Sequence, residues 1–135
     1  MNKLGIIIQA RTGSTRLPSK MILPFYGNDG ILSILLSRLT QCKLADSIIV
    51  ATTSSSPDDA ICDLVREHRV KCFRGDENDV LDRFYQAASI FQPDYVVRVT
   101  SDCPLIDPNL IDQVIEATLS SNVDYGANIF IEEFS

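Results

Sequence analysis

Residues 4–20 read LGIIIQARTGSTRLPSK, and this stretch decides the fold class of the chain. Its first part, residues 4–8, is apolar, too short for a buried helix and followed by polar residues, which predicts a central, buried β-strand. The second part, residues 9–20, contains one glycine, four hydroxyl side chains and three cations. A buried strand that runs directly into such a loop is typical of a ligand-binding α/β protein.

Further along the chain, short runs rich in β-branched residues alternate with longer segments of helical spacing. The runs at 47–52, 70–73 and 95–100 are predicted strands, and helices are predicted to begin near residues 32, 57, 80 and 108. This alternation predicts an α/β fold, a three-layer sandwich around a mostly parallel sheet. No repeat or linker interrupts it, so we expect a single domain over residues 1–135, with no element assigned to the tail from about residue 124.

The helix signals also make predictions at the level of single residues. Ser56 and Pro57 predict an N-cap and a first helical residue, with Asp59 completing a capping box. Asp79 is the predicted N-cap of the next helix, which Pro93 ends. The inward faces are predicted to carry Ile61, Leu64, Val65 and His68 on the second helix, Leu81, Phe84, Ala88 and Phe91 on the third, and Leu110, Ile111, Val114 and Ile115 on the fourth.

Composition and charge exclude several classes of function. The net charge of −6 disfavours nucleic acid and anionic membranes as partners. The apolar N-terminal run is too short for a signal peptide or a membrane span, so we expect a cytoplasmic protein. The four cysteines are far apart and there is one histidine, which predicts reduced, mostly buried thiols and no zinc site.

The turns that follow the four predicted strands carry polar residues, and they share one edge of a parallel sheet. These turns are residues 9–20, 52–56, 74–79 and 101–102. Ligands of open α/β sheets bind at the carboxyl ends of the strands. The sequence therefore predicts a single crevice lined by all four turns.

The first turn has the composition of a phosphate-binding loop. Gly13 allows backbone N–H groups to approach an anion, hydroxyls such as Ser14 donate to its oxygens, and Arg11, Arg16 and Lys20 neutralise it. The alternative is a solvated surface loop with scattered cations. The loop contains neither a GxxxxGK[ST] nor a GxGxxG motif, which removes the main support for a P-loop ATPase or a Rossmann dehydrogenase.

Asp102 directly follows the fourth strand, where a carboxylate opposite a phosphate loop would suit Mg²⁺. The equally weighted alternative is that its side chain hydrogen-bonds the turn. For Asp79, capping of a helix is the favoured interpretation, and contact with a ribose or base is the alternative. Cys103 lies beside Asp102, but no histidine is near it in the sequence, which disfavours thiol catalysis.

The segments that carry these turns resemble a known family. Residues 10–20 (ARTGSTRLPSK), 50–53 (VATT), 74–83 (RGDENDVLDR) and 97–108 (VRVTSDCPLIDP) are similar to the cytidylyltransferase family of spore-coat polysaccharide biosynthesis protein F. That group is related to the synthetases of CMP-sialic acid and CMP-Kdo. The resemblance implies a nucleotide-diphospho-sugar transferase-like, Rossmann-like fold. It also implies transfer of CMP from CTP to a sugar or sugar acid, with pyrophosphate leaving, in surface polysaccharide biosynthesis.

The resemblance assigns roles by position. Arg11 and Lys20 would hold the triphosphate as the catalytic cations, assisted by Arg16, in the loop that contains Gly13 and Ser14. The backbone around Ala10, together with Arg74 and Asp79, would define the cytosine and ribose site. Asp102 would be a ligand of Mg²⁺, the implied cofactor.

Members of the family are considerably longer, and their second half supplies a further metal-ligating carboxylate, acceptor contacts and much of the dimer interface. The chain ends at Ser135, where that half would begin. We therefore expect nucleotide binding, with turnover and a homodimer as open questions. Two alternatives are a glycosyltransferase-like domain that binds nucleotide-sugars and a non-catalytic binding or assembly module. The fourth turn lacks the Asp-x-Asp motif that glycosyltransferases usually carry. An exposed strand near Ile129 would favour the binding or assembly module.

Overall fold

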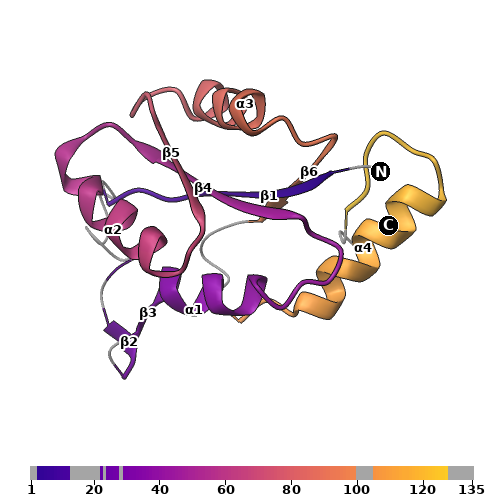
Figure 1. Cartoon of the computed structure of the whole chain (residues 1–135), viewed down its shortest axis with the longest axis horizontal. Helices are drawn as coiled ribbons and strands as arrows, with labels where there is room; N and C mark the ends of the chain where they lie inside the picture. The colour runs from indigo at the N-terminus through magenta and orange to yellow at the C-terminus, as the bar shows by residue number, and fades with distance from the viewer. Residues whose placement is uncertain (1–2, 13–21, 23, 28, 100–104, 128–135) are drawn as a thin grey trace, which may run out of the picture.

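The computed structural model of the chain describes residues 3–12, 22, 24–27, 29–99 and 105–127. Within these residues a parallel sheet of four strands has the order β5-β4-β1-β6 (Figure 1). The strands and helices in chain order are β1 (Leu4–Gln9), β2 (Pro24–Tyr26), β3 (Asp29–Gly30), α1 (Ile31–Leu39), β4 (Ser47–Thr53), the short 3₁₀ helix η1 (Ser56–Asp58), α2 (Asp59–Glu67), β5 (Lys71–Gly75), α3 (Val80–Phe91), β6 (Tyr95–Val99) and α4 (Pro108–Ser120).

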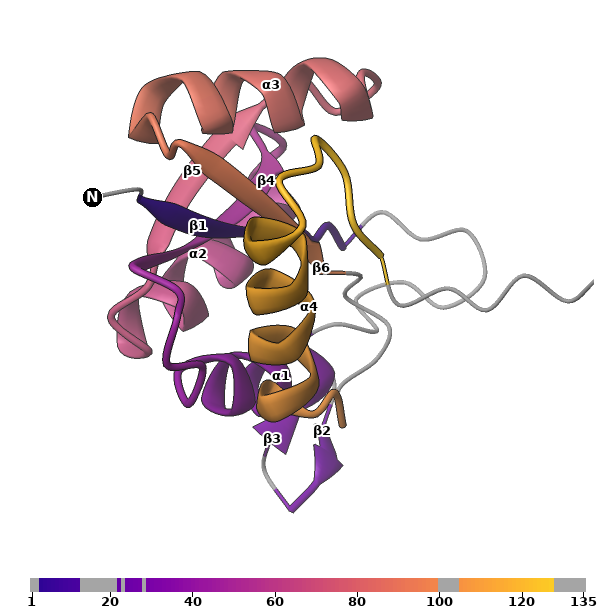
Figure 2. The same ribbon diagram turned by 90° about the vertical axis from the view of Figure 1, so that its right-hand side faces the viewer.

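The helices form layers on both faces of the sheet, which confirms the predicted three-layer α/β fold. Figure 2 shows α3 on one side of the strands and α1 and α2 on the other. The larger core cluster joins α1, α2 and α4 to β1, β4 and β6. The smaller cluster joins α3 to Ile7, Ile49 and Ala51.

β1 is the central strand that its sequence predicts. Ile6 and Ile8 belong to the larger cluster, whereas Ile7 points to the α3 side, and all three are fully buried. Side chains of a strand alternate between faces, so an uninterrupted run of isoleucines can bury both. Their burial explains why this stretch contains almost no polar residue.

Several local predictions are wrong in detail. Residues 24–30, for which the sequence predicted no strand, contain the antiparallel pair β2 and β3. Ser56 and Pro57 lie in η1, and no side-chain cap is formed at the start of α2. Leu81 is 79% exposed, and the buried residues of α3 are Arg83 and Ala87. The other three residues predicted to face inward on α3, Phe84, Ala88 and Phe91, do pack against the smaller cluster. Arg83 turns inward because it donates to Gln9 and to the carbonyl of Asp76, which a hydrophobic pattern cannot reveal.

In the described part of the chain, none of the helices combines the length and the apolar character that crossing a bilayer would require. The longest, α4, has thirteen residues, whereas a span needs about twenty. α4 instead packs Ile111 and Ile115 against the larger core cluster. It begins where the sequence predicts, and it is capped by the Asp107 side chain, which accepts a hydrogen bond from the N–H of Asn109 at 2.9 Å.

Candidate active site

The strand order places the carboxyl ends of β1 and β6 side by side. β1 pairs in parallel with β6, with Ile8 opposite Val99, so both strands end at the same edge of the sheet. β4 and then β5 lie on one side of β1, and β6, the next strand in the chain, lies on the other side of β1. This reversal of strand order is the position at which α/β folds open a ligand crevice. The predicted single crevice therefore has its topological basis at the ends of β1 and β6.

Five of the predicted site residues fall outside the described residues. These are Gly13, Ser14, Arg16 and Lys20 in the first turn and Asp102 in the fourth, together with Cys103 beside it. Their roles stay predictions. Ala10, Arg11, Arg74 and Asp79 are described, and all four lie where strands end or helices begin at the carboxyl edge.

The start of the first turn is firmly attached to the sheet. Ala10 is buried and its N–H donates to the carbonyl of Ala51 at 3.1 Å, which extends the pairing with β4. Arg11 is exposed, whereas Thr12 is buried. The chain thus presents Arg11 to solvent from between two anchored residues, and its role in triphosphate binding stays a prediction.

Thr12 is anchored by Asp58, a buried carboxylate that sequence reasoning missed. The backbone N–H and the hydroxyl of Thr12 both donate to Oδ1 of Asp58 at 2.7 Å, and the hydroxyl of Thr53 donates to Oδ2. Burial by itself raises the pKa of this carboxyl, but the hydrogen bonds from Thr53 and Thr12 outweigh it and lower the pKa. Asp58 therefore stays charged and fixes the base of the first turn to the turn after β4.

The sequence contained one signal for Asp58. It follows Ser56-Pro57 in a polar turn at the end of a buried strand, a place where an aspartate has either a capping or a tethering role. Its partner Thr12 lies 46 residues earlier, so only the pairing of β1 with β4 brings the two together.

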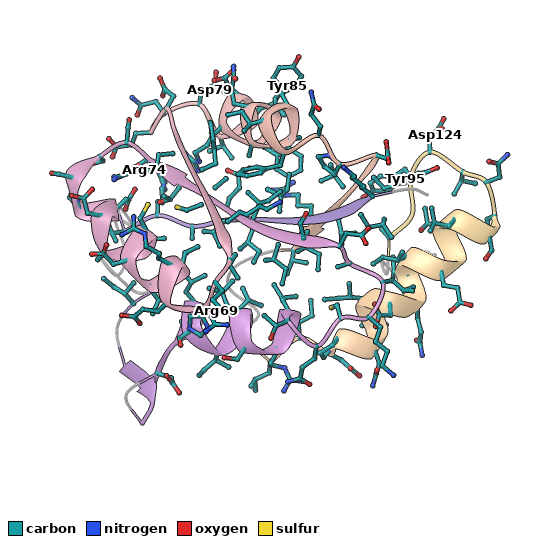
Figure 3. The ribbon with its side chains drawn as sticks, viewed as in Figure 1. Arg69, Arg74, Asp79, Tyr85, Tyr95 and Asp124 are labelled. Atoms are coloured by element: carbon teal, nitrogen blue, oxygen red, sulfur yellow. The ribbon has the colours of Figure 1, made fainter. Side chains whose placement is uncertain are left out.

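Arg74 lies at the end of β5 and is occupied by contacts within the protein. Its Nε donates to the carbonyl of Thr53 at 2.8 Å, its Nη2 to the carbonyl of Ser55 at 2.7 Å, and its Nη1 to Oδ1 of Asp59 at 2.5 Å. Figure 3 shows it at the same end of the molecule as Asp79 and far from Tyr95 and Asp124. Arg74 therefore shapes the turn after β4, and a nucleotide contact would use its remaining donors.

Asp79 caps α3, as predicted from its position. It has extended backbone angles, and Oδ1 accepts a hydrogen bond from the N–H of Asp82 at 2.9 Å. Asp76 closes the preceding turn by accepting from the N–H groups of Asn78 and Asp79. The acidic run after β5 is thus explained by local backbone hydrogen bonds, and the contact of Asp79 with a ribose or base stays a prediction.

Arg83 is a second buried charge at this edge, on the opposite face from Arg74. It is 2% exposed, with Nη1 donating to the carbonyl of Asp76 at 3.0 Å and Nη2 donating to Oε1 of Gln9 at 2.9 Å. Burial first, and the charge of Arg11 second, lower the pKa of Arg83. No acidic side chain of the described residues forms an ion pair with it.

The described residues contain no cluster of three or more acidic, histidine or cysteine side chains suited to a metal ion. Asp58, Asp76 and Asp79 already accept hydrogen bonds from the backbone. The predicted ligand of Mg²⁺, Asp102, lies outside the described residues, so its role stays a prediction.

The remaining polar groups lie elsewhere. Nε2 of His68 is 2.9 Å from the hydroxyl of Ser33, between α1 and the end of α2. Cys42, Cys62 and Cys72 are free thiols. The contact of His68 with Ser33 agrees with the expected inward position of His68, and the free thiols agree with the expectation that these cysteines are reduced.

Comparison with known proteins identifies the family. The family model described as cytidylyltransferase matches residues 5–134. The chain belongs to the cytidylyltransferase family. The resemblance seen in the four turn motifs is therefore confirmed, and spore coat polysaccharide biosynthesis protein SpsF of Bacillus subtilis is 38% identical over 93% of this chain and 53% of its own length.

Two solved structures extend the likeness to the fold. A cytidylyltransferase from Leptospira borgpetersenii is 42% identical with a TM-score of 0.83, over 89% of this chain and 50% of that one. CMP:2-keto-3-deoxy-manno-octonic acid synthetase, solved in complex with CTP, is 22% identical with a TM-score of 0.77, over 90% of this chain and 49% of that one. This cytidylyltransferase chain spans about half the length of the curated relatives it matches.

Proposed function

We propose that the chain binds CTP and forms the nucleotide-binding part of an enzyme that transfers CMP to a sugar or sugar acid. The observation that supports the proposal is the parallel pairing of β1 with β6, since the cation-rich turn and the turn of Asp102 follow these two strands in the sequence. Family membership supports the reaction class. The synthetase solved with CTP and the polysaccharide biosynthesis relative support the nucleotide and a carbohydrate acceptor.

The proposed roles follow the positions of the residues. Arg11 and Lys20 hold the triphosphate, with help from Arg16 and from the N–H and hydroxyl groups around Gly13 and Ser14. The backbone at Ala10, with Asp79 and the free donors of Arg74, borders the base and ribose. Asp102 holds Mg²⁺, which when bound neutralises phosphate charge and orients the triphosphate.

The reaction needs positioning and charge neutralisation rather than a protein nucleophile. An acceptor hydroxyl attacks the α-phosphorus of CTP, a new P–O bond forms, and the bond to the β-phosphate breaks. Pyrophosphate leaves with the electron pair of the broken bond, and the hydroxyl proton passes to solvent or base. Arg11 and Lys20 stabilise the negative charge that develops on the leaving pyrophosphate.

The test is calorimetric titration of the chain with CTP in the presence and absence of Mg²⁺. Lys20→Ala is expected to weaken binding at least about tenfold, because one cation on a polyphosphate is lost. Asp102→Asn is expected to reduce the gain in affinity from Mg²⁺. Lys43→Ala and Asp124→Asn, at exposed positions away from the carboxyl edge, are the matched controls. Absence of CTP binding by the wild-type chain would overturn the proposal.

A second candidate function, an assembly module, is favoured by the outer edge of β6. β6 is the last strand of the described sheet, and Val96 on it is 39% exposed. A hollow of about 510 Å³ lies between β6, α4 and residues 125–127. Two measurements separate nucleotide binding from assembly: the mass of the chain in solution, and its thermal melt with and without CTP and Mg²⁺. A stable oligomer with no ligand-dependent shift would favour assembly.

A further inference from the structure

We infer that Gln9, held in a fixed orientation by Arg83, makes the site prefer cytosine over uracil. This inference rests on the proposed function, because it concerns the base of the nucleotide bound at that site. It assigns Gln9 as a specificity-determining residue and Arg83 as a positioning residue.

Gln9 lies where a ligand in the crevice would meet the sheet. It is the last residue of β1, the central strand at the switch in strand order, and it directly precedes Ala10. Ile7, two residues earlier, faces α3, so the side chain of Gln9 leaves the strand on that same face. Gln9 is half-buried, whereas the preceding residues of β1 are buried.

Arg83 reaches Gln9 from the first turns of α3. Its two terminal nitrogens donate to different groups, one to Oε1 of Gln9 and one to the carbonyl of Asp76. Gly75 makes room for it, because a Cβ atom at residue 75 would lie 3.1 Å from Cγ of Arg83 and 2.9 Å from Cε1 of Phe73. The guanidinium is thus clamped between the end of β1 and the turn after β5.

This arrangement is expensive for stability, which points to a role in recognition. A nearly fully buried charge with no acidic partner among the described residues carries a large desolvation penalty. In addition, Nε of Arg83 is buried without a hydrogen-bond partner in the described part of the chain. If Arg83 served packing alone, an uncharged side chain would fill this space without the desolvation penalty.

The hydrogen bond determines how the Gln9 amide is oriented. A guanidinium has donors and no acceptor, so the Gln9 atom that faces Arg83 must be the carbonyl oxygen Oε1. The other end of the amide, Nε2, then presents two N–H donors, and it has no hydrogen-bond partner within the described residues. Arg83 therefore converts an ambivalent amide into a dedicated donor at the edge of the crevice.

A dedicated donor distinguishes the two pyrimidines by their N3 atoms. Cytosine carries acceptors at both O2 and N3, whereas uracil carries an N–H donor at N3. A donor from Nε2 at N3 would pair with cytosine and would meet the N–H of uracil donor to donor. When uracil binds, the Nε2 donor of Gln9 would stay without an acceptor, and an unpaired polar group in a binding site strongly disfavours the wrong ligand.

The test measures the dissociation constants of CTP and UTP, each with Mg²⁺, for the wild type and for Gln9→Glu. The substituted carboxylate still accepts from Arg83, but it replaces the donor Nε2 with an acceptor oxygen that suits the N3–H of uracil. We expect the wild type to prefer CTP at least about tenfold, and Gln9→Glu to lose that preference or reverse it. Taking the CTP/UTP ratio cancels the general repulsion between the new charge and the triphosphate.

Two further variants separate recognition from structure. Gln113→Glu makes the same chemical change at an exposed position on α4 and should leave the ratio unchanged. Arg83→Lys retains the charge but cannot reach both acceptors at once, so the CTP/UTP ratio should fall in a chain whose thermal melt shows that it is folded.

The outcomes distinguish the inference from the proposed function. A wild type that binds neither nucleotide overturns both. A wild type that binds CTP and UTP equally, or a Gln9→Glu variant that binds with an unchanged ratio, overturns the inference and leaves the proposed function standing.

Discussion

The carboxylate of Asp58 accepts hydrogen bonds from both the backbone N–H and the hydroxyl of Thr12, a residue 46 positions earlier in the chain. Thr12 begins the cation-rich turn after β1, and Asp58 ends the turn after β4. This contact couples the two turns at the edge where we propose that CTP binds.

Replacing Asp58 with alanine is expected to destabilise the fold by about 2–3 kcal/mol, because buried N–H and hydroxyl groups of Thr12 and Thr53 would lose their acceptor. The free energy of unfolding in urea measures this change. Asp63→Ala, at an exposed position on α2 with only a 3.5 Å surface ion pair, is the control and should cost less than about 1 kcal/mol. Equal effects of the two substitutions would contradict the anchoring role.

The pKa of Asp58 makes stability depend on pH in a defined direction. Its pKa is lowered in the folded protein, so the charged form is favoured on folding and contributes stability above its unfolded pKa of about 4. That contribution should be lost as the pH falls below about 4 and through the folded pKa. Urea unfolding between about pH 6 and pH 2.5 should show a shallower acid decline for Asp58→Asn than for the wild type.

Arg74 should be more important for stability than for nucleotide affinity. Arg74→Lys is expected to destabilise the chain by about 1–2 kcal/mol, since a lysine cannot serve Thr53, Ser55 and Asp59 together. Chemical unfolding and CTP titration on the same variant decide between the two roles. A large loss of CTP affinity in a chain of unchanged stability would favour the direct nucleotide contact suggested by family resemblance.

Gly75 should tolerate no side chain. Gly75→Ala places a Cβ atom 2.9 Å from Cε1 of Phe73 and 3.1 Å from Cγ of Arg83, and this crowding should cost about 1–3 kcal/mol. Because Arg83 must move, the same variant should also discriminate less between CTP and UTP. An unchanged melting temperature would show that the end of β5 relaxes freely.

The described thiols should be slow to react. Burial first, and the hydrogen bond with Cys62 second, raise the pKa of Cys72 to about 12, and burial with the charge of Asp112 raises the pKa of Cys42 to about 11. Since the thiolate is the reactive species, alkylation by iodoacetamide at pH 8 should be much slower at these two residues in the folded chain than in urea. Peptide mass spectrometry measures the extent of alkylation at Cys42 and Cys72. Rapid labelling of Cys72 in the folded chain would contradict its burial.

The sequence determined by itself the features that depend on neighbouring residues. The isoleucine run predicted a central strand because a strand buried on both faces cannot alternate with polar residues. The sequence predicted Asp79 as a helix cap because a cap accepts its hydrogen bond within three residues of its own position. The four turn motifs also indicated the cytidylyltransferase family, which the comparisons confirm.

The features that only the tertiary structure decided all join residues that are far apart in the chain. The anchoring role of Asp58 was missed because its partner Thr12 is 46 residues away. The burial of Arg83 was missed because its partner Gln9 is 74 residues away. The order β5-β4-β1-β6 likewise depends on which strands pair, a choice made by packing rather than by local preference. Hydrophobic periodicity reports burial of apolar groups, and it contains no information about the distant donors and acceptors that draw a charged residue inward.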